Sequence, residues 1–478
     1  MKAEFSKYLE GIAPSLKELV RLLGEEYDYV SILSTDSAGL SLNISQHSKS
    51  VSNRNLTTER GNVVRVYKDG RYSEYAWNGF DKDDTEKTAT KIKEELRRQF
   101  ALLELTGSET YITPQLDDEP WELFVEKEAE ILPECADAAS LVNDFTALSD
   151  EGIRTIPGAL DCMVRASSTH ISKMFISSSR FLRQSYVYTE GSIAAYSPNA
   201  DGETKFAYTG VSGLGGLEIL EGLKEKLGEL PKTMTDLLSS ENIVPGEYEI
   251  ITHPSVTGLI AHEAFGHGVE MDMFVKNRAL GAEYIGERVG SELVTMHEGA
   301  VCADSVTAYA FDDEGTLAGD VTEIDRGILK AGICDALSAL RLGVEPTGNG
   351  KRENYAHKAY TRMTNTVFDS GDFTVEEMIS SVEYGYLLVD MESGMEDPKH
   401  WGIQCIVSRG YEIKDGKLTG KVVSPVVMTG YVPDLLGNIT MTSRDRVIEG
   451  NGACGKGHKE WVKVADGGPY LKTKARLG

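Results

Sequence analysis

Cysteine is scarce in this sequence, and the few cysteines present do not form a disulfide framework. The chain has 478 residues and 6 cysteines, and none of them are paired at the short spacings typical of cross-linked modules. Scattered cysteines of this kind are typical of free thiols in a reducing compartment. A chain of this length can bury a full core without cross-links. We therefore expect a cytoplasmic protein.

Positive charge is also in short supply. The chain has 49 lysines and arginines against 75 aspartates and glutamates, which gives a net charge of −26. Such a charge repels phosphate backbones and anionic lipid headgroups, and it leaves little basic surface to release counterions. We therefore expect no direct binding to nucleic acid and no binding to a membrane surface.

Long hydrophobic runs are missing as well. No stretch approaches the roughly 20 apolar residues that a membrane-spanning helix requires. The N-terminal run MKAEFSKYLEGIAPSLKELVRLLGEEY is charged every few positions and does not resemble a secretory signal. Hydrophobic residues make up 41% and charged residues 26% of the chain, which is typical of a folded globular protein.

The first 230 residues predict a mixed α/β domain. Asp69-Gly70 lies between two alternating β-rich runs and predicts a hairpin turn. Short strand-like runs separated by Gly, Ser and Asn over residues 161–210 predict antiparallel strands. Apolar residues at helical spacing predict helices over three ranges: 3–24, 84–105 and about 121–149.

The remainder of the chain is Gly-rich and β-rich. Pro231 and the pair Pro245-Gly246 bracket a change in pattern, so we place a domain boundary near residue 230. Within residues 231–478 we expect helices at 254–270 and 375–381, and a turn at Asp415-Gly416. The predicted fold class is α+β, with an N-terminal mixed α/β domain (1–230) and a β-rich C-terminal domain (231–478).

The segment HEAFGH carries two histidines and a glutamate at the spacing H-E-x-x-x-H. In zinc hydrolases two imidazoles hold the metal, while an adjacent glutamate that is not a ligand takes a proton from the bound water. His262 and His267 are therefore candidate ligands, and Glu263 is the candidate general base. The alternative is that both histidines are ordinary packing residues of a helix.

The five-residue step between the histidines does not fit a regular α-helix. Five residues turn about 500°, which leaves the two side chains roughly 140° apart. A single π-type turn would bring positions i and i+5 together, and Gly266 makes such a distortion easier. We therefore predict a helix that begins near Pro254 and is bulged or interrupted between Ala264 and Gly266.

A catalytic zinc needs a third protein ligand and an open position for water. The best candidate is Cys454 in the Gly-rich run GNGACGKGH, because a thiolate is a soft, anionic ligand. His458 is the rival ligand in the same loop. Three further candidates are weaker, and the two carboxylates among them suit the orientation of the histidines better than ligation: Cys302, Glu270 and Asp272.

At this point the sequence resembles the TldD/PmbA family of zinc metallopeptidases, once described as modulators of DNA gyrase. The matching motifs cover most of residues 245–478, and their order makes the resemblance specific. They are HEAFGHGVEMD (262–272), SELVT (291–295), DDEGT (312–316), the GILKAGICDALSALRLG stretch from Gly327, RMTNT (362–366) and GACGKG (452–457).

The resemblance implies a catalytic, TldD-like subunit, because the HExxxH motif is intact. It implies zinc bound by His262, His267 and Cys454, with Glu263 as the general base. It also implies a dimer, commonly a heterodimer with a PmbA/TldE-like chain, that encloses the active site and admits extended or unfolded polypeptide.

One segment departs from the family pattern. Residues 392–410 read ESGMEDPKHWGIQCIVSRG, and His400-Trp401 occupies the place where TldD-like chains carry a tG-x-F-like pattern. If this segment shapes the cleft, the substrate preference of this chain differs from that of its relatives. The alternative is a surface hairpin with a packed tryptophan.

These observations predict a zinc-dependent metallopeptidase in which Glu263 activates a zinc-bound water. Asn365 in RMTNT is a candidate for contact with the substrate oxyanion, because side-chain amides suit that role. Two other functions remain open. One is a metal-dependent amidohydrolase of small amides, and the other is a regulatory binding protein without catalysis.

Overall fold

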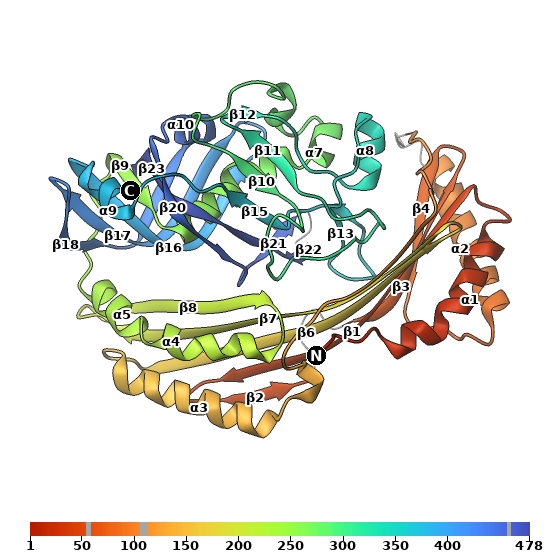
Figure 1. Cartoon of the computed structure of the whole chain (residues 1–478), viewed down its shortest axis with the longest axis horizontal. Coiled ribbons are helices and arrows are strands. Elements are labelled where there is room, and N and C mark those ends of the chain that lie inside the picture. The colour runs from red at the N-terminus through yellow and green to blue at the C-terminus, as the bar shows by residue number, and fades with distance from the viewer. Residues whose placement is uncertain (54–58, 106–111, 457–459) are drawn as a thin grey trace.

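The protein forms two layers that face each other (Figure 1), as seen in a computed structural model that describes residues 1–53, 59–105, 112–456 and 460–478. The lower layer in the view is an N-terminal sheet with helices on its outer face, and the upper layer is the C-terminal domain. This mixed α/β and β-rich architecture confirms the predicted fold class. Among the described residues, no helix is both long and apolar enough to cross a membrane.

Three long antiparallel strands form the middle of the N-terminal sheet. They are β1 (Tyr29–Ile44), β6 (Asp161–Ser177) and β7 (Arg180–Pro198). In the described part of the chain the order is β4-β3-β1-β6-β7-β5, with β2 beside β1 and β8 beside β7. The shorter strands are β2 (Lys49–Ser52), β3 (Arg60–Lys68), β4 (Arg71–Trp77), β5 (Trp121–Glu126) and β8 (Thr204–Leu214).

The hairpin turn and the antiparallel strands predicted for this domain are confirmed. Strands β6, β7 and β8 form the expected antiparallel run. Lys68 pairs with Arg71, so Asp69-Gly70 is the turn of the β3–β4 hairpin, and both turn residues have positive φ. This backbone conformation is the one that two-residue hairpin turns require.

Two groups of helices cover the same face of the sheet at its two ends. Side chains on one face of β1 are buried under both groups, with Ile32 in the first cluster and Leu42 in the second. The first group is α1 (Lys7–Leu23) and α2 (Thr85–Leu105), and the second is α3 (Ala138–Thr155), α4 (Leu223–Leu227) and α5 (Leu230–Leu238).

The prediction of one helix over residues 121–149 is partly wrong. Its first six residues form strand β5, which pairs in parallel with β7, and α3 begins only at Ala138. Asp137 caps α3, because its side chain accepts hydrogen bonds from the backbone N–H groups of Ala139 and Ser140. The short run WELFVE fits either state by its pattern, and only pairing with β7 selects the strand.

The C-terminal domain is built around strand β23 (Ala465–Leu477). In the described residues the sheet order is β12-β11-β10-β15-β23-β19-β17-β16-β9, and β23 also pairs with β9, so the last five strands close a ring. The strands are β9 (Gly246–Thr252), β10 (Met296–Glu298), β11 (Val321–Asp325), β12 (Ile328–Leu329), β15 (Asn365–Phe368), β16 (Tyr384–Asp397), β17 (Gly402–Lys414), β18 (Lys417–Val423), β19 (Val426–Tyr431) and β20 (Met441–Glu449).

Short elements complete this domain. Asp415-Gly416 joins β17 to β18 as predicted, and the helix expected at 375–381 is α9. The remaining elements are α7 (Asp272–Val275), α8 (Ala336–Leu342), α9 (Val375–Ser380), α10 (Val432–Gly437), and the two-stranded pairs β13 (Gly350–Lys351) with β14 (Tyr360–Thr361) and β21 (Ala453–Lys456) with β22 (Glu460–Lys463).

The predicted boundary between residues 230 and 231 falls at the start of α5. Leu230, Met234 and Leu237 of α5 are buried in the apolar cluster beneath the N-terminal sheet. Strand β9 then enters the C-terminal core, and it leads directly into the helix that carries the HExxxH motif. The motif is therefore positioned by the C-terminal sheet.

Candidate metal centre

The HExxxH helix begins where the sequence predicts. His253 caps the first turn of α6 (Pro254–Leu259), and Pro254 occupies the first helical position. Proline is tolerated there because that backbone N–H has no partner within the helix. Val256 and Leu259 then bury the helix in the C-terminal core.

The same helix changes its winding at the motif. Residues Ile260–Gly266 form a π-helix, and His267–Val269 continue as a 3-10 turn. The extra residue per turn brings positions i and i+5 onto one face. The rings of His262 and His267 accordingly lie 5.1 Å apart, nearly perpendicular to each other. The predicted distortion of the helix is confirmed.

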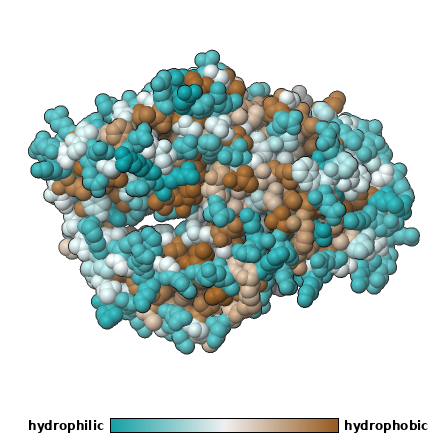
Figure 2. All heavy atoms as spheres, in the orientation of Figure 1, coloured by the Kyte–Doolittle hydropathy of each residue, from teal (hydrophilic) through white to brown (hydrophobic). Residues whose placement is uncertain are grey.

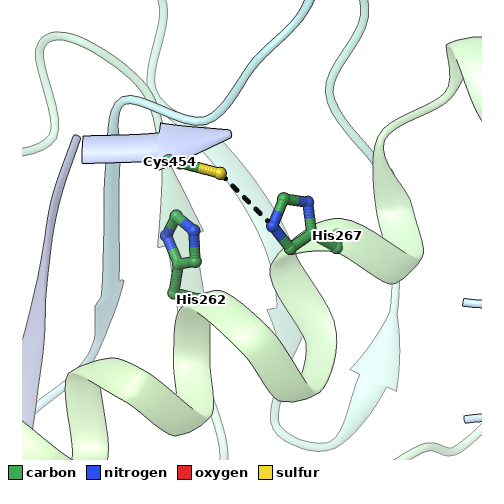
Figure 3. Close-up of side chains that lie close together, drawn as sticks. All are labelled: His262, His267 and Cys454. Atoms are coloured by element: carbon green, nitrogen blue, oxygen red, sulfur yellow. Dashed lines mark hydrogen bonds between the residues drawn. The ribbon is translucent and has the colours of Figure 1, made fainter. Parts of the chain in front are cut away.

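Cys454 approaches the two histidines from a segment near the C-terminus. It lies on β21, and its Sγ is 3.3 Å from Nε2 of His267. Figure 3 shows the thiol directed toward both imidazoles. Candidate ligand atoms of His262, His267 and Cys454 all lie within 4.8 Å of one another, and in the described residues this is the group of metal-ligating side chains that converges.

The chemistry of this donor set fits zinc. Two imidazoles and a thiolate are the ligands that zinc prefers, and three protein ligands leave a fourth position open. His262 is 4% exposed, and its Nδ1 has no hydrogen-bond partner among the described residues. A buried nitrogen without a partner lowers stability. A bound group that contacts the His262 ring would remove this cost.

The surroundings favour an ionised thiol. Burial raises the pKa of Cys454, but hydrogen bonds from His262 and His267 outweigh this effect and lower the pKa to about 4. Burial lowers the pKa of His267, but Glu270 and the Cys454 thiolate raise it well above its ordinary value. The thiolate is the form of cysteine that binds metals.

Glu270 and Lys456 orient His267 from behind. Nδ1 of His267 lies 3.0 Å from Oε2 of Glu270, so Nε2 is the nitrogen that faces Cys454. Lys456 Nζ is 3.0 Å from Glu270 and 2.7 Å from Asp272. Glu270 thus supports the histidine directly and Asp272 only through Lys456, which is the lesser role that the sequence allowed for the two carboxylates. The sequence motifs gave no role to Lys456, although it lies in the same GACGKG run as Cys454.

Glu263 is half-buried on the π-helix and lies against β16. A Cβ at Gly394 would overlap Cγ of Glu263, so the glycine makes room for this side chain. Glu263 is not part of the converging ligand group. It directly follows the candidate ligand His262 in the chain, and its side chain packs against β16.

The remaining candidates lie elsewhere or are already engaged. His458 falls outside the described residues. Cys302 donates a hydrogen bond to the backbone O of Asn365 and does not join the ligand group. The Asn365 amide is fully buried: its oxygen accepts from Ser305 and Thr307, and its nitrogen donates to backbone carbonyls. This amide holds a loop together and has no donor left for a substrate.

The segment that departs from the family pattern forms the β16–β17 hairpin. Trp401 is 0% exposed, has a positive φ of 57°, and packs on Phe265 of the HExxxH helix at a ring distance of 5.8 Å. A packed tryptophan is therefore what the structure shows. Its contact with Phe265 also links the hairpin to the helix that carries the histidines.

Comparison with known proteins identifies the C-terminal region. Residues 245–475 match the family described as PmbA/TldA metallopeptidase C-terminal domain. A metalloprotease TldD homolog from Buchnera aphidicola is 34% identical over 50% of this chain and 49% of its own length. A zinc metalloprotease TldD homolog from Saccharolobus solfataricus is 28% identical over 53% of this chain and 56% of its own length. The chain thus spans about half the length of these relatives.

Two further similarities extend over the whole chain. A metalloprotease from Synechocystis is 26% identical over 98% of both chains. The crystal structure of TldE from Thermococcus kodakarensis superposes with a TM-score of 0.77 at 16% identity, covering 97% of this chain and 100% of that chain. The structural match establishes the fold. The sequence matches confirm the resemblance to the TldD/PmbA family.

Proposed function

We propose that this chain, whose residues 245–475 belong to the TldD/PmbA metallopeptidase family, is a zinc-dependent metallopeptidase that hydrolyses peptide bonds in extended or unfolded polypeptides. The observation that carries the proposal is the convergence of His262, His267 and Cys454, with Glu263 directly after His262 in the chain. A purely structural zinc site does not need a free glutamate next to its ligands. A catalytic site does, because the attacking water must lose a proton.

The chain's own residues would divide the work as follows. His262, His267 and Cys454 would hold the metal, and Glu270 would keep Nε2 of His267 turned toward it. Zinc, when bound, supplies a Lewis acid that polarises a carbonyl and acidifies water. Glu263 would take the proton from the attacking water and deliver it to the leaving amine.

An opening between the two layers supports access for an extended chain. Figure 2 shows this opening, with hydrophobic side chains on both sides of it. Phe206 and Tyr208 of β8 are each 42% exposed. The loop that leads to Cys454 is fixed to the same strand, because Gly450 N–H donates to Ser212 at 2.9 Å and Asn451 donates to Val211 O at 2.9 Å. Exposed apolar side chains on the strand that holds this loop suit unfolded polypeptide.

The metal assignment is tested by elemental analysis of the wild-type protein and the Cys454→Ala variant. We expect about one zinc per wild-type chain and much less in the variant, because three protein ligands are the minimum for a catalytic zinc site. Cys302→Ala is the matched control and should retain the metal, since Cys302 is not in the ligand group. Full zinc content in Cys454→Ala would rule out the assigned ligand set.

The catalytic role of Glu263 is tested by Glu263→Gln. The amide keeps the shape of the side chain but cannot accept a proton, so we expect zinc to be retained while peptide cleavage falls by at least about 100-fold. Glu292→Gln, at a side chain that is 85% exposed, is the control. Cleavage should be followed on a library of mixed peptide lengths. Undiminished cleavage by Glu263→Gln would refute the role, and hydrolysis of small amides alone would favour an amidohydrolase.

We also propose that the chain works as a dimer, either with itself or with a PmbA/TldE-like partner, in a cytoplasmic setting. The support is the family resemblance. Size-exclusion chromatography with light scattering, alone and after co-expression with a TldE-like chain, should give a species of two chains. A stable monomer under both conditions would contradict this proposal without affecting the metal assignment.

A further inference from the structure

A pocket whose lining includes none of the candidate metal ligands has a charge opposite to that of the chain. It encloses about 800 Å³ where β4 and α2 approach α8 and residues 352–358 (Figure 1). This volume is within the range of small-molecule sites. Among the described lining residues Glu74 is the sole carboxylate, whereas the bases are Arg65, Arg71, Arg341, Arg352, His357 and Lys358.

The single carboxylate of the pocket is already shared. Glu74 accepts hydrogen bonds from Arg65 at 2.7 Å and from Arg352 at 2.9 Å. Burial raises the pKa of Glu74, but these two guanidinium groups outweigh it and lower the pKa to about 2. The carboxylate is thus fully ionised, and its negative charge is balanced by the two buried arginines. It does not neutralise the rest of the lining.

Three basic side chains of the lining have groups that an anion could contact. Nε of Arg352 is buried and has no hydrogen-bond partner among the described residues, although the side chain is only 4% exposed. Within the described part of the chain, Arg71 forms an ion pair with Glu104 at 3.9 Å, on a side chain that is 73% exposed. Lys358 is exposed at the rim, near the ring of Tyr360. A surface ion pair of the Arg71–Glu104 kind contributes little.

The pocket also offers apolar contact. Leu102 on α2 lines it and is 59% exposed, and Val63, Leu337 and the ring of Tyr355 lie in the same lining. A bare inorganic ion would leave this surface uncovered. We propose that the pocket binds a small organic anion with a phosphate or carboxylate head and an apolar body. The site is separate from the metal centre and does not depend on the proposed peptidase activity.

The test uses three small probes and the full-length protein at low ionic strength, because salt screens partly exposed charges. The probes are phenyl phosphate, benzoate and the neutral benzyl alcohol, titrated by calorimetry or ligand-observed NMR. We expect saturable binding of at least one of the two anions and much weaker binding of the alcohol. The tighter of the two anions identifies the head group.

Variants then locate the site. Arg71→Gln combined with Lys358→Gln should weaken anion binding at least tenfold, whereas Arg98→Gln, at a side chain on α2 that is 69% exposed, should leave it unchanged. Cys454→Ala should also bind normally, which excludes the metal centre as the anion site. No saturable binding of either anion, equal affinity in the double variant, or equal binding of benzyl alcohol would overturn the proposal.

Discussion

Glu270 fixes the orientation of His267, one of the three candidate metal ligands. It is 1% exposed and is itself held by Lys456, so the imidazole cannot rotate freely. Partners of this kind fix the tautomer and direction of a ligating histidine, and their removal weakens metal binding. The geometry of the centre therefore depends on residues that do not touch the metal.

We expect Glu270→Gln to weaken zinc binding about 10- to 100-fold. The amide fills the same space but is a poorer acceptor for the His267 N–H. Competition with a chromophoric chelator measures the affinity. Asp272→Asn is the matched control, because Asp272 also contacts Lys456 but not His267, and its affinity should fall less. Equal losses in both variants would show that the Lys456 network matters and the His267 contact does not.

The π-helix is the element on which the centre depends. Gly266 lies at its end, where a Cβ would overlap Sδ of Met363 and come within 3.1 Å of the backbone O of Ala261. Met363 is 1% exposed and has little room to move. A side chain at position 266 must therefore displace either the helix or the Met363 side chain, which lies between β14 and β15.

We expect Gly266→Ala to lower the free energy of unfolding by about 1–3 kcal/mol through overpacking, and to weaken zinc binding because His267 follows directly. Gly11→Ala in α1 is the matched control: it also places a methyl group on a helical glycine, but nothing lies within 4 Å. That variant should gain roughly 0.5–1 kcal/mol. Urea denaturation and the chelator assay give both quantities. A Gly266→Ala protein as stable as Gly11→Ala would contradict the packing argument.

At the scale of the whole molecule, buried ion pairs join the two layers. Arg352 from the C-terminal domain contacts Glu74 on β4, and Arg65 on β3 contacts both Glu74 and Glu314. Lys173 on β6 pairs with Asp313 in the same region. Removing one member of such a set leaves buried charge uncompensated, so the contact between the layers is sensitive to acid.

We expect Glu74→Gln to be less stable than the wild type by about 3 kcal/mol at pH 6. The pKa of Glu74 is about 2 in the folded protein, against 4.5 ordinarily, so its contribution is complete above pH 4.5 and is lost as the pH falls toward 2. The gap between variant and wild type should therefore narrow on acidification. Urea denaturation between pH 6 and pH 3 measures it, with the exposed Glu122→Gln as control. A difference in unfolding free energy between wild type and variant that does not change with pH would refute this role of the Glu74 pKa.

Much of the fold and part of the site follow from local sequence. The period of α1, the turns at Asp69-Gly70 and Asp415-Gly416, and the antiparallel strands over 161–210 all depend on neighbouring residues, so their patterns predict them. The distortion of the HExxxH helix also follows from sequence, because a five-residue spacing cannot place two imidazoles together on a regular helix.

Other features were decided by contacts between distant parts of the chain. Cys454 meets His267 across 187 positions because β21 lies over the metal-binding helix, and the sequence could only nominate it by chemistry. β5 is a strand because β7 pairs with it. The Asn365 amide is buried in a loop because side chains and carbonyls of residues 299–307 bond to it. Trp401 is buried in part because it packs on Phe265. Local periodicity carries no information about such partners, since sheet topology sets which segments meet.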